Sequence, residues 1–387
     1  MKKKICIITT SFPNHKNDST SAGVFVRDFA LLLAEQNFDV YVLTPKMKSS
    51  TYDDDRIHVH FFPWFGGKLG FSAHNARNPV HLLKLSSAVI SGLGFTSRFV
   101  KKNKIDYCLA MWAVPAGLFT FVTKIFCKTP YIVWVLGSDI WNIQDYPFGK
   151  FILKKVLKNA SKIFADGLQL AKDVRDISGR RCEFLASSRI LSKDLQEIDY
   201  TKFDPSKINF MFLGRYHHNK GVDLLIEAIT LLSKEEREKS LFHIFGGGPL
   251  ESKIKKMVKE HDLKSNTFVN SYLDGNKAFA YMSKSDFVVI PSRIESIPIV
   301  LSDALQSNKP VVLTNVGDMG KLASEYKIGF VQEPNARSIA EGLRSGIKLD
   351  QHEKESFLKG MNELMDYLDL KKSVKTFIKS INQDIFH

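Results

Sequence analysis

Short apolar runs alternate with longer amphipathic stretches along most of the chain. Residues 3–9, 38–43 and 107–110 have the length of buried strands, and apolar positions at helical spacing follow them. Strands that alternate with helices form parallel sheets, so the pattern predicts an α/β protein. The further strands expected on the same grounds are 131–136, 162–165, 181–185, 208–213, 241–245, 286–290 and 310–314.

A polar stretch, residues 197–207, interrupts this alternation near the middle of the 387-residue chain. A chain of this length is long for one hydrophobic core. We therefore predict a first domain over 1–203 and a second over 204–369. A C-terminal helix within 370–387 could cross back to the first domain.

Two segments depart from the alternation. Residues 61–80 crowd aromatic side chains around three glycines and predict a long surface loop. That loop either covers a ligand or packs over its own aromatics. Residues 148–162 place Phe148 and Phe151 among five lysines. This pattern is typical either of a face that lies on an anionic membrane or of a solvated face over a packed stripe.

Composition narrows the class of protein. The 44% hydrophobic and 25% charged residues are ordinary for a globular protein, and the four cysteines lack metal-ligand spacing, which indicates thiols in the reducing cytoplasm. The longest apolar window, 109–122, is too short to cross a bilayer, and the N-terminal apolar run is too short for a signal peptide. The net charge of +14 favours an anionic partner. Because nucleic-acid motifs and GxGxxG turns are missing from the sequence, we expect no nucleic-acid partner and no dinucleotide.

The stretch IPSRIESIPIVLSDALQ, residues 290–306, places two acids near the end of an expected strand. Pro291 ends that strand, Glu295 follows on a loop, and Asp303 lies about one turn into the next helix. Open α/β sheets bind ligands at the carboxyl ends of their strands, and a helix N-terminus suits a diphosphate. The stretch therefore predicts a nucleotide-sugar pocket.

Two glycine-containing turns are expected at the same sheet edge. In GRYHHNKG, residues 214–221, Arg215 and Lys220 could clamp a diphosphate, or they could form surface ion pairs with acids of the following helix. In FGGGP, residues 245–249, the glycines either let backbone approach a ligand or simply connect a strand to a helix. Each signal is weak alone, whereas their order with residues 290–306 is specific.

Metal binding is not expected. His217 and His218 are adjacent, so their side chains diverge, and we interpret them as exposed loop residues. Asp53, Asp54 and Asp55 are interpreted as a charged hairpin, against the alternative of a metal-dependent sugar-nucleotide site.

Taken in order, these motifs resemble those of glycosyltransferase family 4, the retaining GT-B enzymes, over nearly the full chain. In the first half, MWAVPAG (111–117) and LGSDI (136–140) resemble the family's acceptor-side segments, and the region around Gly23 resembles its first glycine loop and helix. The resemblance implies the GT-B fold, with two Rossmann-like α/β/α domains facing each other across a cleft.

The resemblance also implies an activity. It indicates a retaining, hexosyltransferase-type enzyme that moves a sugar from a nucleoside-diphosphate sugar to a glycan or lipid-linked acceptor, in polysaccharide or glycolipid synthesis, without a metal or other cofactor. Arg215 and Lys220 would hold the phosphates, Glu295 would meet sugar hydroxyls, and these three are the catalytic candidates. Asp303 would hold the ribose. Further implied residues are Gly23, Gly214, Gly247, Ser296, Ile297 and Ile299 on the donor side, and Trp112 and Asp139 on the acceptor side.

Two departures from the family pattern keep other functions open. Asp303 stands where the family usually has glutamate, and Leu136 stands where related segments often have histidine. A sugar-nucleotide epimerase or hydrolase, or a non-catalytic nucleotide-sugar-binding subunit, would also fit. Asp139 either caps a helix or points into the crevice. The cysteines indicate a cytoplasmic protein, and the net charge and residues 148–162 leave open that it lies on the inner face of the membrane.

Overall fold

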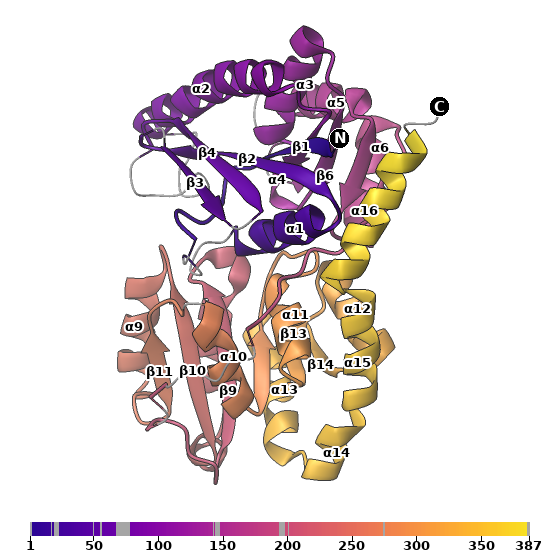
Figure 1. Ribbon diagram of the computed structural model, residues 1–387. Coiled ribbons are helices and arrows are strands. Elements are labelled where there is room, and N and C mark those ends of the chain that lie inside the picture. Colours follow the sequence, from indigo (N-terminus) through magenta and orange to yellow (C-terminus); the bar gives the residue numbers. More distant parts are fainter. Residues whose placement is uncertain are drawn as a thin grey trace. The chain divides into compact units, whose positions relative to one another are not determined.

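The computed structural model describes residues 2–384 except 17, 19–22, 49, 55, 67–77, 142, 144–147, 193–197, 200 and 274. The chain divides into two compact units, one of Met1–Ser187 with Leu370–His387 and one of Ser188–Asp369. The division thus falls before the expected boundary at 203, and the C-terminal segment groups with the first unit. Each unit contains one sheet with helices packed against it (Figure 1).

The first unit is built on a sheet of eight strands in the order β3-β4-β2-β1-β5-β6-β7-β8. All neighbours pair in parallel except β3 and β4, which form an antiparallel hairpin. Strand β6 is buried along its whole length, as expected of a central parallel strand covered on both faces. The strands are β1 Lys3–Ile8, β2 Phe38–Lys46, β3 Ser50–Asp54, β4 Ile57–Pro63, β5 Tyr107–Met111, β6 Tyr131–Val135, β7 Lys162–Ala165 and β8 Glu183–Phe184.

The β3–β4 hairpin tests two predictions from the sequence, the charged hairpin at residues 53–55 and the long loop over residues 61–80. Asp53 and Asp54 lie in β3, where Asp53 contacts His58 at 2.7 Å, so the charged run belongs to a hairpin; Asp55 lies outside the described residues. Because β4 continues through Pro63, the loop expected from residue 61 begins later than predicted. Phe61 in β4 and Trp64 just after it are buried, and residues 67–77 of that loop are not among those described.

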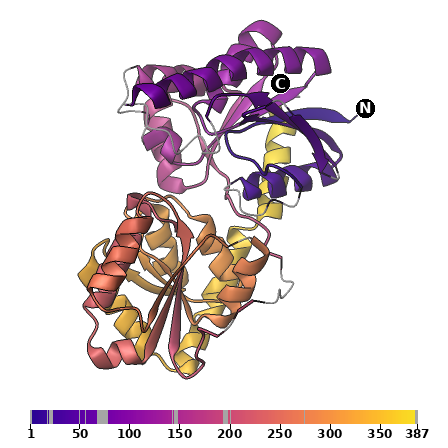
Figure 2. The ribbon, with the colours of Figure 1, turned by 90° about the vertical axis from the view of Figure 1, so that its left-hand side faces the viewer.

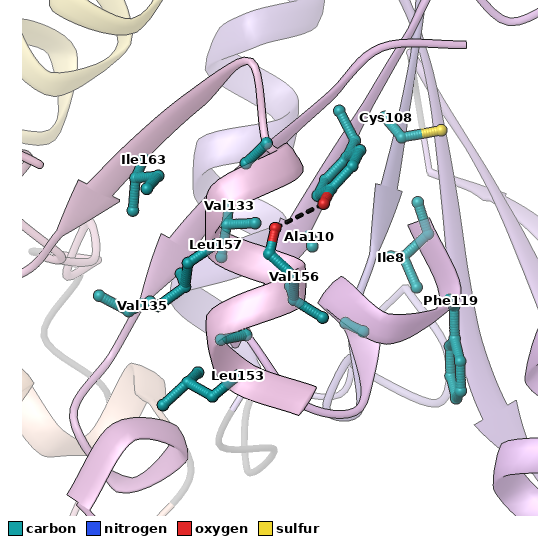
Figure 3. Close-up of a cluster of buried hydrophobic side chains, with 14 of the residues drawn as sticks. Ile8, Cys108, Ala110, Phe119, Val133, Val135, Leu153, Val156, Leu157 and Ile163 are labelled. Carbon is teal, nitrogen blue, oxygen red and sulfur yellow. Dashed lines mark hydrogen bonds between the residues drawn. The ribbon is translucent and has the colours of Figure 1, made fainter. Parts of the chain in front are cut away.

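Helices cover both faces of the first sheet. On one face, Val133 and Val135 of β6 pack against Val156 and Leu157 of α5 (Figure 3), and the Tyr131 hydroxyl donates to the Val156 carbonyl at 2.5 Å. On the other face, Phe29 of α1 packs edge to face against Phe377 of α16, with the ring centres 5.3 Å apart. The helices are α1 Val24–Glu35, α2 Pro79–Asn103, α3 Ala116–Cys127, α4 Ser138–Trp141, α5 Gly149–Asn159, α6 Leu168–Ser178 and α16 Leu370–Asp384.

The second unit contains a six-stranded parallel sheet in the order β11-β10-β9-β12-β13-β14. From β9 the chain proceeds outward through β10 and β11, and then returns to β12 on the other side of β9. The order therefore reverses between β9 and β12, and ligands of such sheets bind at the carboxyl ends beside that point. The strands are β9 Ile208–Arg215, β10 Ser240–Gly247, β11 Thr267–Asn270, β12 Phe287–Ile290, β13 Val311–Thr314 and β14 Gly329–Gln332.

Helices lie on both sides of this sheet as well (Figure 2). The helix Val222–Thr230 is followed by a separate short helix, which Ser233 starts with a capping box to Glu236. The helices are α7 Val222–Thr230, α8 Lys234–Glu238, α9 Glu251–Glu260, α10 Gly275–Lys284, α11 Ile299–Gln306, α12 Gly317–Tyr326, α13 Ala336–Lys348, α14 Gln351–Ser356 and α15 Leu358–Tyr367, with one 3₁₀ turn, His218–Lys220. Within the described residues, every helix is too short or too polar to span a bilayer.

Candidate active site

The loops that follow β9 and β12 meet at the point where the strand order reverses. Gly221 has a φ of +65°, and a Cβ there would lie 1.8 Å from the Pro291 carbonyl oxygen, so only glycine permits this approach. The Nζ atom of Lys220 pairs with Oε2 of Glu295, and the Ser292 hydroxyl lies 3.4 Å from the same oxygen. The structure thus brings together the cation and the first acid that the sequence singled out.

This ion pair is partly open to solvent, with side-chain exposures of 36% for Lys220 and 17% for Glu295. A ligand can therefore reach both groups. The Glu295 backbone is held from the other side by Gly317, where a Cβ would lie 2.0 Å from the Glu295 carbonyl oxygen. Close packing thus holds the main chain of Glu295, and the Lys220 and Ser292 side chains contact its carboxylate.

Arg293 anchors the same loop, a role that no sequence pattern had indicated. Its guanidinium donates to both carboxylate oxygens of Asp223, at 2.7 and 3.1 Å, and to the His218 carbonyl at 2.7 Å. Burial alone would raise the pKa of Asp223, but the guanidinium and Lys253 bring it below its usual value. Asp223 therefore supports the β12 loop and is not the partner of Lys220.

The N-terminus of α11 follows this loop directly. Pro298 is its N-cap residue and has no N–H, while the N–H groups of Ile299 and Val300 lack intrahelical partners. Ser296 and Ile297 are buried, and the Ser296 hydroxyl is without a hydrogen-bond partner within the described part of the structure. Donor groups thus collect where the sequence predicted a phosphate site.

Arg215 and the glycines of β10 form a neighbouring cluster. Gly214 pairs with Gly246, and a Cβ on Gly246 would lie 1.9 Å from the Gly214 carbonyl oxygen. The Tyr272 hydroxyl donates to the Gly247 carbonyl at 2.5 Å, and burial raises the pKa of this hydroxyl while Arg215 opposes the rise. The glycines thus allow tight packing of strand ends and of Tyr272, a residue that sequence reasoning missed.

Asp303 lies in α11 with a different partner. Arg189 donates to both of its carboxylate oxygens, at 2.8 and 2.6 Å, and the Asp303 side chain is only 2% exposed. Gln306, one turn further along α11, donates to the Arg189 carbonyl at 2.8 Å. The acid that was expected to hold a ribose is therefore engaged by an arginine that no sequence pattern had marked.

In the first unit, Asp139 joins two loops at the carboxyl edge of the sheet. One of its oxygens accepts from the Ala113 N–H at 2.5 Å, and the other accepts from the Leu136 N–H at 3.1 Å. Burial raises the pKa of Asp139 to about 6, and these N–H groups limit the rise. The Asp139 carboxylate thus accepts hydrogen bonds from backbone N–H groups of its own unit.

The other first-unit candidates occupy unusual backbone positions. Trp112 has a φ of +72°, and its ring lies 6.2 Å from that of Phe25, edge to face. A Cβ on Gly23 would lie 2.2 Å from the Ser11 carbonyl oxygen, so this glycine permits close packing at the start of α1; residues 19–22 before it lie outside the description. As far as the chain is described, no group of three His, Cys, Asp or Glu side chains is placed to hold a metal ion.

Comparison with known proteins defines the class. The model for glycosyl transferases group 1 matches residues 196–359, and the model for glycosyl transferase 4-like proteins matches residues 19–167. An uncharacterized glycosyltransferase of Methanocaldococcus jannaschii is 27% identical over 265 residues, which are 67% of this chain and 70% of that protein.

Two further comparisons extend over most of the chain. The N-acetylgalactosamine-N,N'-diacetylbacillosaminyl-diphospho-undecaprenol 4-alpha-N-acetylgalactosaminyltransferase of Campylobacter jejuni is 23% identical, over 81% of this chain and 83% of its own length. The structure of Anabaena HepE in complex with UDP-glucose superposes with a TM-score of 0.71 at 13% identity, over 98% of this chain and 99% of that one.

The two parallel sheets and the structural likeness define a GT-B fold of two Rossmann-like domains. The chain belongs to the group 1, family 4-like glycosyltransferases, and it is a transferase of glycosyl groups, class EC 2.4.

Proposed function

We propose that the protein is a retaining glycosyltransferase that moves a sugar from a nucleoside-diphosphate sugar to a glycan or lipid-linked acceptor. The observation that carries the proposal is the partly exposed pair of Lys220 and Glu295 at the reversal of strand order. Support comes from HepE, which was crystallised with UDP-glucose, and from the C. jejuni relative, whose name describes a diphospho-undecaprenol acceptor.

The chemistry follows from what these side chains offer. When a donor binds, the ammonium of Lys220 would turn from Glu295 to the diphosphate and stabilise the charge that develops as the glycosidic bond breaks. Arg215 and the N–H groups at the start of α11 would add further positive potential. Since these groups supply the neutralising charge, we propose a metal-independent reaction.

Glu295 would then be free to accept hydrogen bonds from the sugar hydroxyls. Asp303 can meet a ribose only beside Arg189, because a carboxylate has about four acceptor positions and the guanidinium takes two. Retention would follow if the leaving phosphate accepts the acceptor's proton on the same face of the sugar, with no separate general base.

We place the reaction in the cytoplasm, at a membrane that presents the acceptor. The four cysteines are free thiols in the structure, which fits a reducing compartment. Synthesis of a cell-surface polysaccharide or glycolipid would use such an enzyme.

The test is a screen of purified protein against radiolabelled nucleotide sugars, with and without glycan and lipid-linked acceptors. Transfer is expected only when an acceptor is present, and Glu295→Ala should abolish it while Glu227→Ala, an exposed acid on α7, should leave it unchanged. Conversion of donor without acceptor would indicate an epimerase or hydrolase instead. Donor binding without any turnover by the wild type would indicate a non-catalytic subunit.

A further inference from the structure

Three neighbouring helices of the first unit carry only positive charge. Helices α2, α3 and α5 together contain nine Lys and Arg residues and no Asp or Glu. A helix whose polar face contacts only water usually carries both acidic and basic residues, because i,i+4 pairs of opposite charge stabilise it. The one-sided charge therefore indicates a function for this layer.

Helix α9 of the second unit shows the ordinary arrangement. It has four lysines, as α5 does, but Lys255 pairs with Glu251 at 2.6 Å and Lys256 pairs with Glu260 at 3.5 Å. In α5, no ion pair links a lysine to any residue that the structure describes. The Nζ atom of Lys155 instead lies 5.6 Å from the ring centre of Phe151.

Large apolar side chains stand among these cations. Phe148, at the N-cap of α5, is 80% exposed and Phe151 is 61% exposed, so neither belongs to the packed stripe of that helix. The buried stripe consists of Leu153, Val156 and Leu157. The solvated-face explanation of residues 148–162 does not account for two aromatic rings in water.

The neighbouring helices continue the pattern. Leu83 and Ile90 of α2 are each 73% exposed. Ile90 follows Leu83 by seven positions and Lys101 follows Ile90 by eleven, so all three lie on one face of the helix. Phe126, near the end of α3, is 74% exposed. Isolated exposed apolar residues are common, whereas several of this size within one basic layer mark an interaction surface.

Direct contacts join the three helices. The hydroxyls of Ser97 in α2 and Thr123 in α3 lie 3.1 Å apart, and Lys124 of α3 donates to the Asn159 carbonyl at the end of α5 at 2.7 Å. In Figure 1, α2 runs along the outer edge of the first unit with α3 and α5 next to it. We call the exposed lysines and large apolar side chains of these three helices the α2–α3–α5 surface. It consists of Leu83, Ile90, Lys101, Lys102, Phe126, Phe148, Lys150, Phe151, Lys154, Lys155 and Lys158.

We propose that the α2–α3–α5 surface docks on an anionic phospholipid bilayer. The apolar side chains enter the headgroup region and the lysines contact lipid phosphates, the two contributions that hold interfacial helices on membranes. A second copy of the chain is a poor occupant, because two surfaces that each carry only positive charge repel. Docking would bring the enzyme to a lipid-linked acceptor, and this role of the surface rests on the proposed function.

The experiment is sedimentation of the full-length protein with vesicles, without donor or acceptor, so that its result is independent of transferase activity. The protein should bind vesicles of phosphatidylglycerol and phosphatidylcholine, bind poorly to phosphatidylcholine alone, and dissociate as salt is raised. Lys150→Gln/Lys154→Gln/Lys158→Gln should lower the partition coefficient by about a hundredfold, since each lysine near an anionic surface contributes about fivefold. Phe148→Ser/Phe151→Ser should lower it by about tenfold or more through lost apolar burial.

The matched control is Lys255→Gln/Lys256→Gln/Lys259→Gln in α9, which changes net charge by the same amount and should bind like the wild type. An equal loss in this control would mean that net charge alone drives binding, and would overturn the proposal. Failure of the wild type to bind, or equal binding to neutral vesicles, would overturn it too. All substituted side chains are exposed, so near-native circular dichroism and melting are expected of every variant.

Discussion

Arg189 binds both carboxylate oxygens of Asp303, at 2.8 and 2.6 Å, in surroundings that leave the aspartate side chain 2% exposed. The arginine lies at the start of the second unit, whereas the acid lies in α11, just beyond the candidate phosphate site. The pair therefore connects the entry of the chain into this unit with the helix that begins at the site. Its strength determines how firmly α11 is held.

Loss of Arg189 should destabilise the protein strongly, because it leaves a buried charge without a partner. We expect Arg189→Met to lower the free energy of unfolding by about 3–5 kcal/mol in urea denaturation of the full chain. The double variant Arg189→Met/Asp303→Leu should regain most of this loss, since no buried charge remains. Lys239→Met, which breaks an exposed pair with Glu235, is the control and should change stability by about 0.5 kcal/mol or less.

Lys220 should matter for turnover more than for stability. We expect Lys220→Met to lower kcat/KM for the donor sugar by about 10² to 10³, the usual effect of removing one group that stabilises transition-state charge. Its melting temperature should stay close to that of the wild type, because the side chain is 36% exposed. Lys234→Met, on an 86% exposed side chain of α8, is the control, and equal kinetics for both variants would contradict the role given to Lys220.

Gly221 should tolerate no side chain. Alanine at this position meets two obstacles, the left-handed backbone and the Pro291 carbonyl oxygen 1.8 Å from the added Cβ. Gly179 is a matched control, with a φ of +69° and nothing within 4 Å of an added Cβ. We expect Gly179→Ala to lose about 1 kcal/mol of stability and Gly221→Ala to lose clearly more, together with transfer activity. Equal losses would show that the loop can move away.

Asp139 should make stability depend on pH. Burial raises the pKa of its carboxyl from 3.8 to about 6, so the folded chain holds this proton more tightly than the unfolded chain does. The bound proton therefore stabilises the folded state. This contribution is complete below the unfolded-state pKa of 3.8 and is lost as pH rises through the folded-state pKa of about 6, and the total loss in the free energy of unfolding is about 3 kcal/mol. The free energy of unfolding relative to Asp139→Asn should therefore fall across this window in urea denaturation at several pH values. A constant difference would mean that the carboxyl is not desolvated.

The sequence predicted much of the fold because strands and helices have different hydrophobic periods. The short apolar runs correctly placed most strands of both sheets, and their alternation with helices indicated parallel pairing. Lys220 and Glu295 could be picked out because each follows a strand, and the carboxyl ends of parallel strands share one edge. The end of β4 was misjudged, because secondary-structure propensity is weak where an element ends.

The amino-acid pattern by itself thus determined the α/β class, the parallel sheets and the edge at which Lys220 and Glu295 lie. Only the tertiary structure decided that Asp303 faces Arg189, that Arg293 holds Asp223, and that Phe148 and Phe151 stand in solvent. Hydrophobic periodicity indicates which face of a helix or strand a residue lies on, and it does not indicate which residue of another element that face contacts. Arg189 and Asp303 are 114 positions apart, and a hydrogen bond over such a separation exists only because two particular elements pack together.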